Sequence, residues 1–310
     1  MNSALVIGYG SVGALHARVL EELGCDVAVV SAREEVHHRC FPDLSSALLR
    51  TAPDYVVVAN ETALHARTVR GVRDAGFLGV ILVEKPVRDT SGEQIDAWAQ
   101  PLYVGYNLRF HPALARLRRE VEGVQIHAAE IRCGSYLPAW RSNRDYRRGA
   151  SASRAAGGGV LRDLSHELDY GVWLLGGWRR LAALGGRVSD LEIETEDVMV
   201  MLLETERCPA VTICVNYLDR PSRRGVHLTT STGSFTLDLV AGLLTDGAGQ
   251  ILESTLALRR EHTYAEQHRA LLSGRPGPCC TLQEGEEVVG MIAATERAAR
   301  TGTWITNHTS

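Results

Sequence analysis

The sequence predicts an α/β domain with a parallel sheet, followed by an α+β domain with a large, open and mainly antiparallel sheet. In the first third of the chain, short apolar segments alternate with amphipathic helical patterns, an order typical of right-handed crossovers in a parallel sheet. In the second half, segments with period-two hydrophobicity follow one another between glycines and prolines, as in antiparallel sheets. Because 310 residues suffice for two domains of ordinary size, we expect residues 1–105 to form the first domain and residues 106–310 the second.

The first element is an apolar strand over residues 4–7 that runs into a glycine turn of the form G-x-G-x-x-G, and a helical pattern follows. In this context the first glycine permits a tight turn, the second lets a pyrophosphate approach the backbone, and the third lets the helix pack close to the strand. The helix N-terminus offers backbone N–H groups and a partial positive charge to phosphates. A flexible turn is the ordinary alternative for an isolated glycine pattern, but the flanking elements favour a dinucleotide-binding Rossmann domain. The cofactor contacts expected here are Gly8, Gly10, Ser11, Val12 and Gly13.

The second strand, over residues 26–30, is followed by Ser31 and Arg33. An NAD site usually has an acidic residue near this point to bind the ribose hydroxyls, whereas here Glu34 and Glu35 come later. A serine donor and the charged fork of an arginine suit a 2′-phosphate instead, although a solvated surface arginine is the plainer interpretation of Arg33. We therefore expect NADP as the preferred cofactor and NAD as the second candidate.

The rest of the first domain continues the alternation of strand and helix. The continuous apolar run over residues 54–59 is typical of a strand buried in a parallel sheet. Asn60, Thr62 and His65 follow this strand at the sheet edge where ligands bind, so they are candidate cofactor contacts, and Thr62 is equally suited to cap the next helix. The remaining predicted helices cover 44–50, 63–75 and 92–99, and the remaining strands cover 79–83 and 102–105.

Glu84, Lys85 and Pro86 end the strand over residues 79–83, at the same edge of the sheet. A lysine held there can donate a hydrogen bond to a substrate hydroxyl or ketone oxygen. The proline fixes the direction of the chain, and an X-Pro bond at this point could be cis. In isolation, most Glu-Lys-Pro tripeptides are simply charged loops.

The second domain begins with a predicted helix over residues 112–122 and ends with helices over 263–273 and 282–300. The segment over 134–156 is rich in arginine and nearly patternless, and loops of this length tend to be functional or disordered. Strands are predicted over 124–133, 181–188, 196–204, 209–217, 225–231, 234–239 and 249–253.

Three glycines at 157–159 precede a predicted helix that starts near Val160. On one continuous helix, Asp163, His166 and Asp169 would share a face because they are three residues apart. A carboxylate beside an imidazole fixes its tautomer and raises its basicity, and imidazole exchanges a proton readily near neutral pH. The alternative is a buried histidine whose nitrogens bond to backbone groups.

Together these motifs resemble the glucose–fructose oxidoreductase/inositol dehydrogenase (Gfo/Idh/MocA) family over nearly the whole chain. The Glu-Lys-Pro element followed by the glycine–aspartate–histidine segment is the more specific part of the resemblance. The other matching segments are the glycine turn, residues 54–65, the run from Gly105 to Phe110 and the last helix, which ends near Gly302.

The resemblance implies a Rossmann domain, an open sheet through which a homodimer or homotetramer forms, and NAD(P)-linked oxidation or reduction of sugars and polyols. It makes Lys85 the catalytic lysine, His166 the proton-transferring residue and Asp163 its polar partner, with Glu84 and Asn107 beside the cofactor. Most family members have four residues from the aspartate to the histidine, and here the interval is three, so His166 is assigned more directly than Asp163. The run from Ser165 to Tyr170 resembles a bacterial subgroup associated with surface-sugar and nonulosonic-acid biosynthesis.

We therefore expect hydride transfer between NADP and a secondary alcohol or ketone of a sugar, including nucleotide-linked sugars. In this hypothesis Lys85 and His166 meet at the nicotinamide. A cofactor-binding regulator or accessory subunit without turnover is one alternative, and a reductase of a non-sugar carbonyl or imine is another. The arginine-rich residues suit phosphates or a carboxylate, although each alone is as compatible with a solvated loop. The candidate substrate contacts are Arg109, Trp140, Arg141, Tyr146, Arg147, Asp163 and His166.

Composition narrows the class of protein further. A net charge of −4 gives no reason to expect nucleic acid or an anionic membrane as a partner. The seven cysteines are odd in number and dispersed, without the spacing of a metal site, which fits a reducing compartment. The first strand starts close to Met1, and no apolar run approaches the length of a membrane span. We expect a cytoplasmic protein with no metal.

Overall fold

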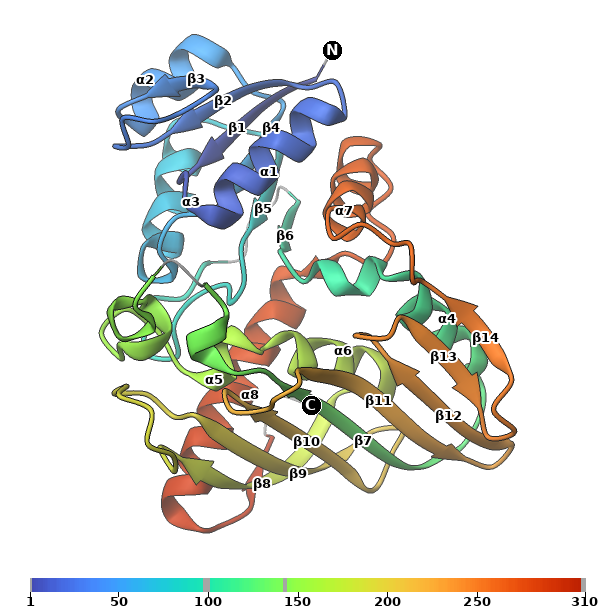
Figure 1. Cartoon of the computed structure of the whole chain (residues 1–310). Coiled ribbons are helices and arrows are strands. Elements are labelled where there is room, and N and C mark those ends of the chain that lie inside the picture. Colours follow the sequence, from blue (N-terminus) through green and yellow to red (C-terminus); the bar gives the residue numbers. More distant parts are fainter. Residues whose placement is uncertain (1, 97–100, 142–143, 308–310) are drawn as a thin grey trace. The chain divides into compact units, whose positions relative to one another are not determined.

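The computed structural model describes residues 2–96, 101–141 and 144–307 (Figure 1). The chain divides into two compact units, Met1–Phe110 with Arg259–Val289 and His111–Leu258 with Gly290–Ser310. The predicted boundary after residue 105 lies close to Phe110, where the chain first passes from one unit to the other. It does not include the return of residues 259–289 to the first unit. That return occurs because α7 (His262–Leu272) packs against α1 (Ser11–Glu22), and β15 (Cys280–Thr281) extends the first sheet.

Within the described residues, the first unit contains a seven-stranded sheet in the order β15-β6-β5-β4-β1-β2-β3. All neighbours are parallel except β15 and β6. The register pairs Ile7 with both Val30 and Val58, and Val58 with Val83, so the carboxyl ends of four strands meet at one edge. The Rossmann prediction is confirmed. The parallel strands are β1 (Ser3–Ile7), β2 (Asp26–Val30), β3 (Arg39–Phe41), β4 (Tyr55–Val58), β5 (Val80–Val83) and β6 (Leu102–Val104).

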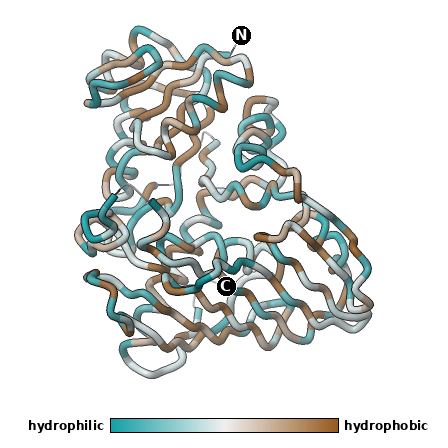
Figure 2. Tube along the Cα trace, viewed as in Figure 1, coloured by the Kyte–Doolittle hydropathy of each residue, from teal (hydrophilic) through white to brown (hydrophobic). Residues whose placement is uncertain are grey.

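The central strands of this sheet, β1, β4 and β5, are buried on both faces. Successive residues such as Val56 and Val57 are both fully buried, because helices cover the sheet on each side. In Figure 2 these strands are hydrophobic along most of their length. This burial is the physical reason for the continuous apolar runs in the sequence. The flanking helices are α1, α2 (Leu44–Thr51), α3 (His65–Asp74) and α7.

Two local predictions in the first unit are wrong. The helix expected from residue 63 begins at His65, after a 3₁₀ turn over Thr62–Leu64, and Leu64 is its N-cap, so Thr62 is not the cap of this helix. Residues 92–96 are not helical, and the rest of the helix predicted over 92–99 lies outside the described residues. The guanidinium of Arg88 donates to three nearby backbone carbonyls and pairs with Glu286, contacts that hold this segment as a turn.

In the described part of the second unit, nine strands form a sheet in the order β14-β13-β12-β11-β7-β10-β9-β8-β16. Every neighbouring pair is antiparallel except β7 and β10, so the prediction of a mainly antiparallel sheet is confirmed. Hydropathy alternates along these strands in Figure 2, as expected when one face packs on helices. The strands are β7 (Ile126–Gly134), β8 (Trp178–Gly186), β9 (Val198–Thr205), β10 (Val211–Asn216), β11 (Arg223–Thr230), β12 (Gly233–Asp238), β13 (Leu243–Asp246), β14 (Ile251–Ser254) and β16 (Ile305–Thr306).

Helices of the second unit pack on one face of this sheet. Helix α4 (Pro112–Glu120) contacts β12, β13 and β14, while α5 (Val160–Asp163) and α6 (His166–Leu175) contact the central strands. The last long helix is α8 (Leu282–Thr301), whose residues are shared between the two units. No helix in the described ranges is both long and apolar enough to cross a membrane.

The single helix predicted from Val160 is wrong. Helix α5 ends at Asp163, Leu164 leaves helical geometry with φ −102° and ψ 31°, and α6 starts at His166. Asp163, His166 and Asp169 therefore do not share one face of a continuous helix. The side chain of Asp163 is held by Tyr217 on the sheet, a tertiary contact that periodicity does not reveal.

Candidate active site

A cavity of about 570 Å³ opens at the carboxyl edge of the parallel sheet. Its walls are the turns that follow β1, β2, β4 and β5, as the register of these strands requires. Two expected cofactor residues, Gly13 and Asn107, are not part of the lining. The expected residues that do line it are Gly8, Gly10, Ser11, Val12, Ser31, Arg33, Asn60, Thr62, His65, Glu84 and Lys85.

The glycine turn at the start of α1 shapes one wall of this cavity. Gly8 has a φ of +97°, and a Cβ there would lie 2.6 Å from the carbonyl oxygen of Ala59. A Cβ on Gly13 would lie 2.0 Å from the carbonyl oxygen of Gly8, so Gly13 serves helix packing. A Cβ on Gly10 would meet nothing within 4 Å, and this N-cap residue offers no capping side chain. The arrangement leaves room for an anion at the helix N-terminus and fits the pyrophosphate of a dinucleotide.

The turn after the carboxyl end of β2 supplies Ser31 and the exposed Arg33 to the same cavity. Among the described residues of the lining, none of those from this turn is acidic, and Glu34 and Glu35 do not line the cavity. The hydroxyl of Ser31 accepts a hydrogen bond from the backbone N–H of Arg33 at 3.0 Å, which fixes the turn. Sequence reasoning missed Tyr9, a lining residue whose hydroxyl is 3.0 Å from Nδ1 of His38.

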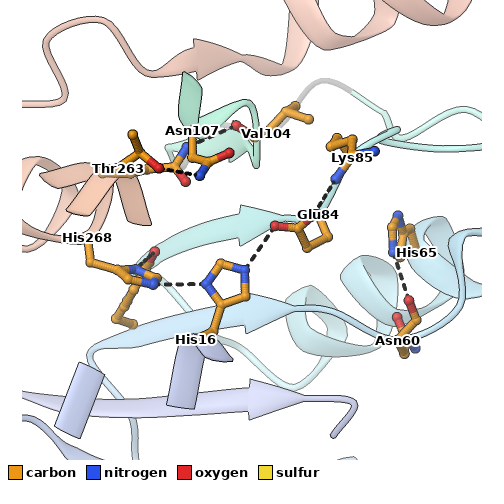
Figure 3. A network of polar contacts seen from close by, with 11 residues as sticks. His16, Asn60, His65, Glu84, Lys85, Val104, Asn107, Thr263 and His268 are labelled. Atoms are coloured by element: carbon orange, nitrogen blue, oxygen red, sulfur yellow. Dashed lines mark hydrogen bonds and ion pairs between the residues drawn. The ribbon is translucent and has the colours of Figure 1, made fainter. Parts of the chain in front are cut away.

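Lys85 lines the cavity and is half-buried, and the bond between Lys85 and Pro86 is cis. The backbone N–H of Lys85 donates to Oε2 of Glu84 at 3.1 Å, as Figure 3 shows. Burial alone would raise the pKa of Glu84, but the hydrogen bond and charge interaction with His16, together with the charge of Lys85, lower it. The carboxylate beside the lysine is therefore ionised and held from two sides.

His65 lines the cavity, but its nitrogens bond to backbone groups. Nδ1 lies 3.2 Å from the carbonyl oxygens of Pro86 and Val87, and Nε2 lies 3.2 Å from that of Asn60. Burial lowers the pKa of His65, although these carbonyls oppose the shift. This ring therefore ties the turn after β4 to the turn after β5, and Figure 3 shows its contact with Asn60.

Two polar residues of the segment after β6 are buried within the first unit. Asn107 donates from its amide to the hydroxyl of Thr263 at 2.7 Å. Arg109 is only 2% exposed and pairs with Glu284 at 2.8 Å. The pair commits charge of Arg109 to Glu284, and it ties the segment to the part of the chain that returns to this unit.

In the second unit, Asp163 and Trp140 both contact Tyr217. The hydroxyl of Tyr217 donates to Oδ2 of Asp163 at 2.6 Å, and its ring contacts that of Trp140 edge to face at 5.3 Å. Burial and the charge of Asp163 raise the pKa of Tyr217, so it remains a donor. The indole N–H of Trp140 donates to the hydroxyl of Ser135 at 2.7 Å. Sequence reasoning missed Tyr217, which follows the end of β10.

Ion pairs hold part of the arginine-rich loop, a segment predicted to be nearly without regular structure. Arg147 pairs with Asp145 and with Glu192, both at 2.8 Å. The hydroxyl of Tyr146 accepts a hydrogen bond from the backbone N–H of Glu192 at 3.3 Å. Arg141 is exposed at the edge of the described part of this loop. The charge of Arg147 is thus largely committed to neighbouring carboxylates.

His166 is half-buried at the start of α6, and the next residue anchors this helix. Glu167 is fully buried and accepts from Arg224 on β11 at 2.7 and 3.1 Å, and from the hydroxyl of Tyr170 at 3.0 Å. A bidentate pair of this kind fixes orientation as well as distance. It attaches the start of α6 to the sheet, close in sequence to the candidate histidine.

Residues 116–236, most of the second unit, match the family model described as the GFO/IDH/MocA C-terminal domain. Outside these residues, the first unit has the Rossmann sheet, the glycine turn and the Glu-Lys-Pro element that the family resemblance implies. Over residues 116–236 the chain matches the Gfo/Idh/MocA family, in agreement with the resemblance of its sequence motifs. No curated protein matches its sequence.

Several solved structures share the fold of nearly the whole chain. GenD2 from gentamicin A biosynthesis, in complex with NAD, is 26% identical with a TM-score of 0.82, covering 99% of this chain and 96% of that one. The WlbA dehydrogenase from Bordetella pertussis, in complex with NADH and UDP-GlcNAcA, is 19% identical with a TM-score of 0.78, covering 100% and 99%. Levoglucosan dehydrogenase, in complex with NADH and levoglucosan, is 14% identical with a TM-score of 0.84, covering 98% and 99%. At these low identities, the similarity to WlbA and to levoglucosan dehydrogenase is one of fold alone.

Proposed function

We propose that this chain is an NAD(P)-dependent oxidoreductase that transfers a hydride between the nicotinamide and a secondary alcohol or ketone of a sugar or sugar derivative. One observation carries the proposal: a single cavity is lined by the N-terminus of α1, which suits a pyrophosphate, and by Lys85, which suits a reacting oxygen. The structurally similar GenD2, WlbA and levoglucosan dehydrogenase proteins were determined with NAD or NADH, which supports the choice of cofactor.

Each candidate residue has a role in this reaction. The bound nicotinamide supplies the hydride chemistry. Lys85 donates a hydrogen bond to the reacting oxygen and stabilises its developing charge. His166 exchanges the proton, and Asp163, held by Tyr217, is its polar partner. The candidate substrate contacts are Arg109, Trp140, Arg141, Tyr146 and Arg147.

A substrate panel tests the proposal. The protein is incubated with NAD⁺ or NADP⁺ and with levoglucosan, UDP-N-acetylglucosamine, UDP-GlcNAcA or gentamicin A, and reduced nicotinamide is followed by its absorbance. We expect turnover with a hydroxyl-bearing sugar of this kind. Intact binding of NADPH without turnover of any panel member or further sugar would contradict the proposal and favour a non-catalytic regulator.

We also propose that NADP is preferred over NAD, because Ser31 and Arg33 line the cavity where the 2′-phosphate of NADP would lie. Arg33→Ala is expected to weaken NADPH binding by about tenfold and to change NADH binding by less than about twofold. Fluorescence titration of both reduced cofactors measures this. Tighter binding of NADH than NADPH by the unmodified protein would overturn the preference.

We propose further that a second copy of the chain covers the open face of the antiparallel sheet, giving a homo-oligomer in the cytoplasm. Leu184 pairs with Val200 across β8 and β9, next to Leu202, and these residues are 76%, 37% and 49% exposed. An apolar group of this kind on a sheet face favours association. Light scattering should give a multiple of the 33.8 kDa chain mass, and Leu202→Lys should lower the measured mass.

All seven cysteines are free, which supports the proposed reducing compartment.

A further inference from the structure

Four buried side chains of the first unit form one line of hydrogen bonds that ends beside Lys85, and Figure 3 shows three of them, His268, His16 and Glu84. The hydroxyl of Tyr55 is 3.0 Å from Nδ1 of His268, and Nε2 of His268 is 2.9 Å from Nδ1 of His16. Nε2 of His16 is 2.9 Å from Oε1 of Glu84, whose other oxygen accepts from the backbone N–H of Lys85. The contributing elements are β4, α7, α1 and the end of β5, so partners far apart in the sequence meet here.

The ionisation of Glu84 fixes the donor at its end of the line. Burial raises the pKa of Tyr55 well above its ordinary value and lowers that of His268 well below it, so the tyrosine is protonated and the histidine neutral. The lowered pKa of Glu84 leaves its carboxylate without a hydrogen to donate, so Nε2 of His16 is the donor in their 2.9 Å bond. His268 and Tyr55 continue the line from the other nitrogen of His16. The line therefore delivers an N–H to Glu84.

The line is not a route for protons to solvent, because it leads into the core. Tyr55 is 2% exposed and packs in the apolar cluster of the parallel sheet. Glu84 is also confined sterically, since a Cβ on Gly105 would lie 2.6 Å from its Oε1. The function that remains for the line is to hold one carboxylate in one place.

We propose that His16, backed by His268 and Tyr55, is a positioning residue that fixes the Glu84 carboxylate and, through it, the backbone of Lys85 at the cavity. This inference rests on the proposed function only in giving Lys85 its role in the reaction. The loss of His16 would leave a buried carboxylate without its main donor while the cost of burial remained. The titratable groups that interact with Glu84 are His16, Tyr55, His65 and Lys85.

Two substitutions of His16 separate positioning from packing. His16→Phe keeps a ring but removes both nitrogens, whereas His16→Gln keeps an N–H that can reach the carboxylate. The carboxyl pKa of Glu84 is measured by ¹³C NMR on protein labelled at glutamate side chains, with Glu84→Gln to assign the signal. We expect this pKa to rise in His16→Phe and to return toward the original value in His16→Gln.

Kinetics give a second readout on the same variants. In His16→Phe, kcat for the panel sugar should fall about tenfold, while the NADH dissociation constant stays within about twofold, and His16→Gln should recover most of the loss. An unchanged pKa of Glu84 in a folded His16→Phe, or no recovery in His16→Gln, would overturn the proposal. If no sugar is turned over, the carboxyl titration still decides the positioning role, so the two failures remain distinguishable.

A milder variant covers the case in which His16→Phe does not fold. Tyr55→Phe removes one oxygen at the far end of the line, and Tyr103→Phe removes one from β6, outside the line. The pKa of Glu84 should rise in Tyr55→Phe and stay unchanged in Tyr103→Phe. The same pKa of Glu84 in these two variants would refute the role of Tyr55 in supporting His16.

Discussion

Replacement of Lys85 by methionine should lower kcat about 10³-fold while leaving NADH binding within about twofold of the original protein. Lys85 is half-buried and lines the cavity, and the proposed reaction needs a donor at the substrate oxygen when charge develops there. Methionine has a similar length and flexibility but no donor. Its backbone N–H can still donate to Glu84, because that bond does not involve the lysine side chain.

The control for this variant is Lys85→Arg, which keeps the positive charge but changes the geometry of donation. We expect an intermediate rate from it, with unchanged NADH fluorescence on binding. Steady-state kinetics with the panel sugar and cofactor titrations on the same preparations make the comparison. A wild-type rate in a folded Lys85→Met variant would remove the lysine from the reaction.

Much of the first unit could be predicted from sequence because its signals are local. The strand predicted over residues 26–30 is β2 to the residue, and the other parallel strands of the core differ by one or two residues. A buried parallel strand shows itself as an apolar run, and its carboxyl end then marks the cavity. For this reason most expected cofactor residues do line one cavity.

The parts that sequence reasoning missed depend on distant partners. His16 and His268 are 252 positions apart, and the sequence around either residue does not predict that the two are in contact. One local signal was present for His16, a polar residue on the buried face of α1 beside Gly13 and Ala17. The interruption of the helix at Leu164 and the burial of Arg109 likewise follow from contacts with other segments. Hydrophobic periodicity contains no information on such pairings.

Arg224→Met should lower the free energy of unfolding of the second unit by about 3–5 kcal/mol. Glu167 is fully buried, and without the arginine its charge would lose the two bonds that Arg224 donates and would remain beside neutral donors such as the hydroxyl of Tyr170. Breaking one side of a buried pair is costly because the remaining charge stays desolvated. Urea unfolding followed by tryptophan fluorescence measures the change, since Trp173 and Trp178 lie in this unit.

Two controls separate this ion pair from general loss of charge. Arg116→Met breaks a partly exposed pair with Glu120 on α4 and should cost no more than about 0.5 kcal/mol. The double variant Arg224→Met with Glu167→Leu removes both charges and should be closer to the original stability than Arg224→Met alone. If Arg224→Met cost no more than Arg116→Met, the buried pair would not be what anchors α6. Because α6 starts at His166, the same pair is also what gives the candidate proton-transferring residue a fixed base on the sheet.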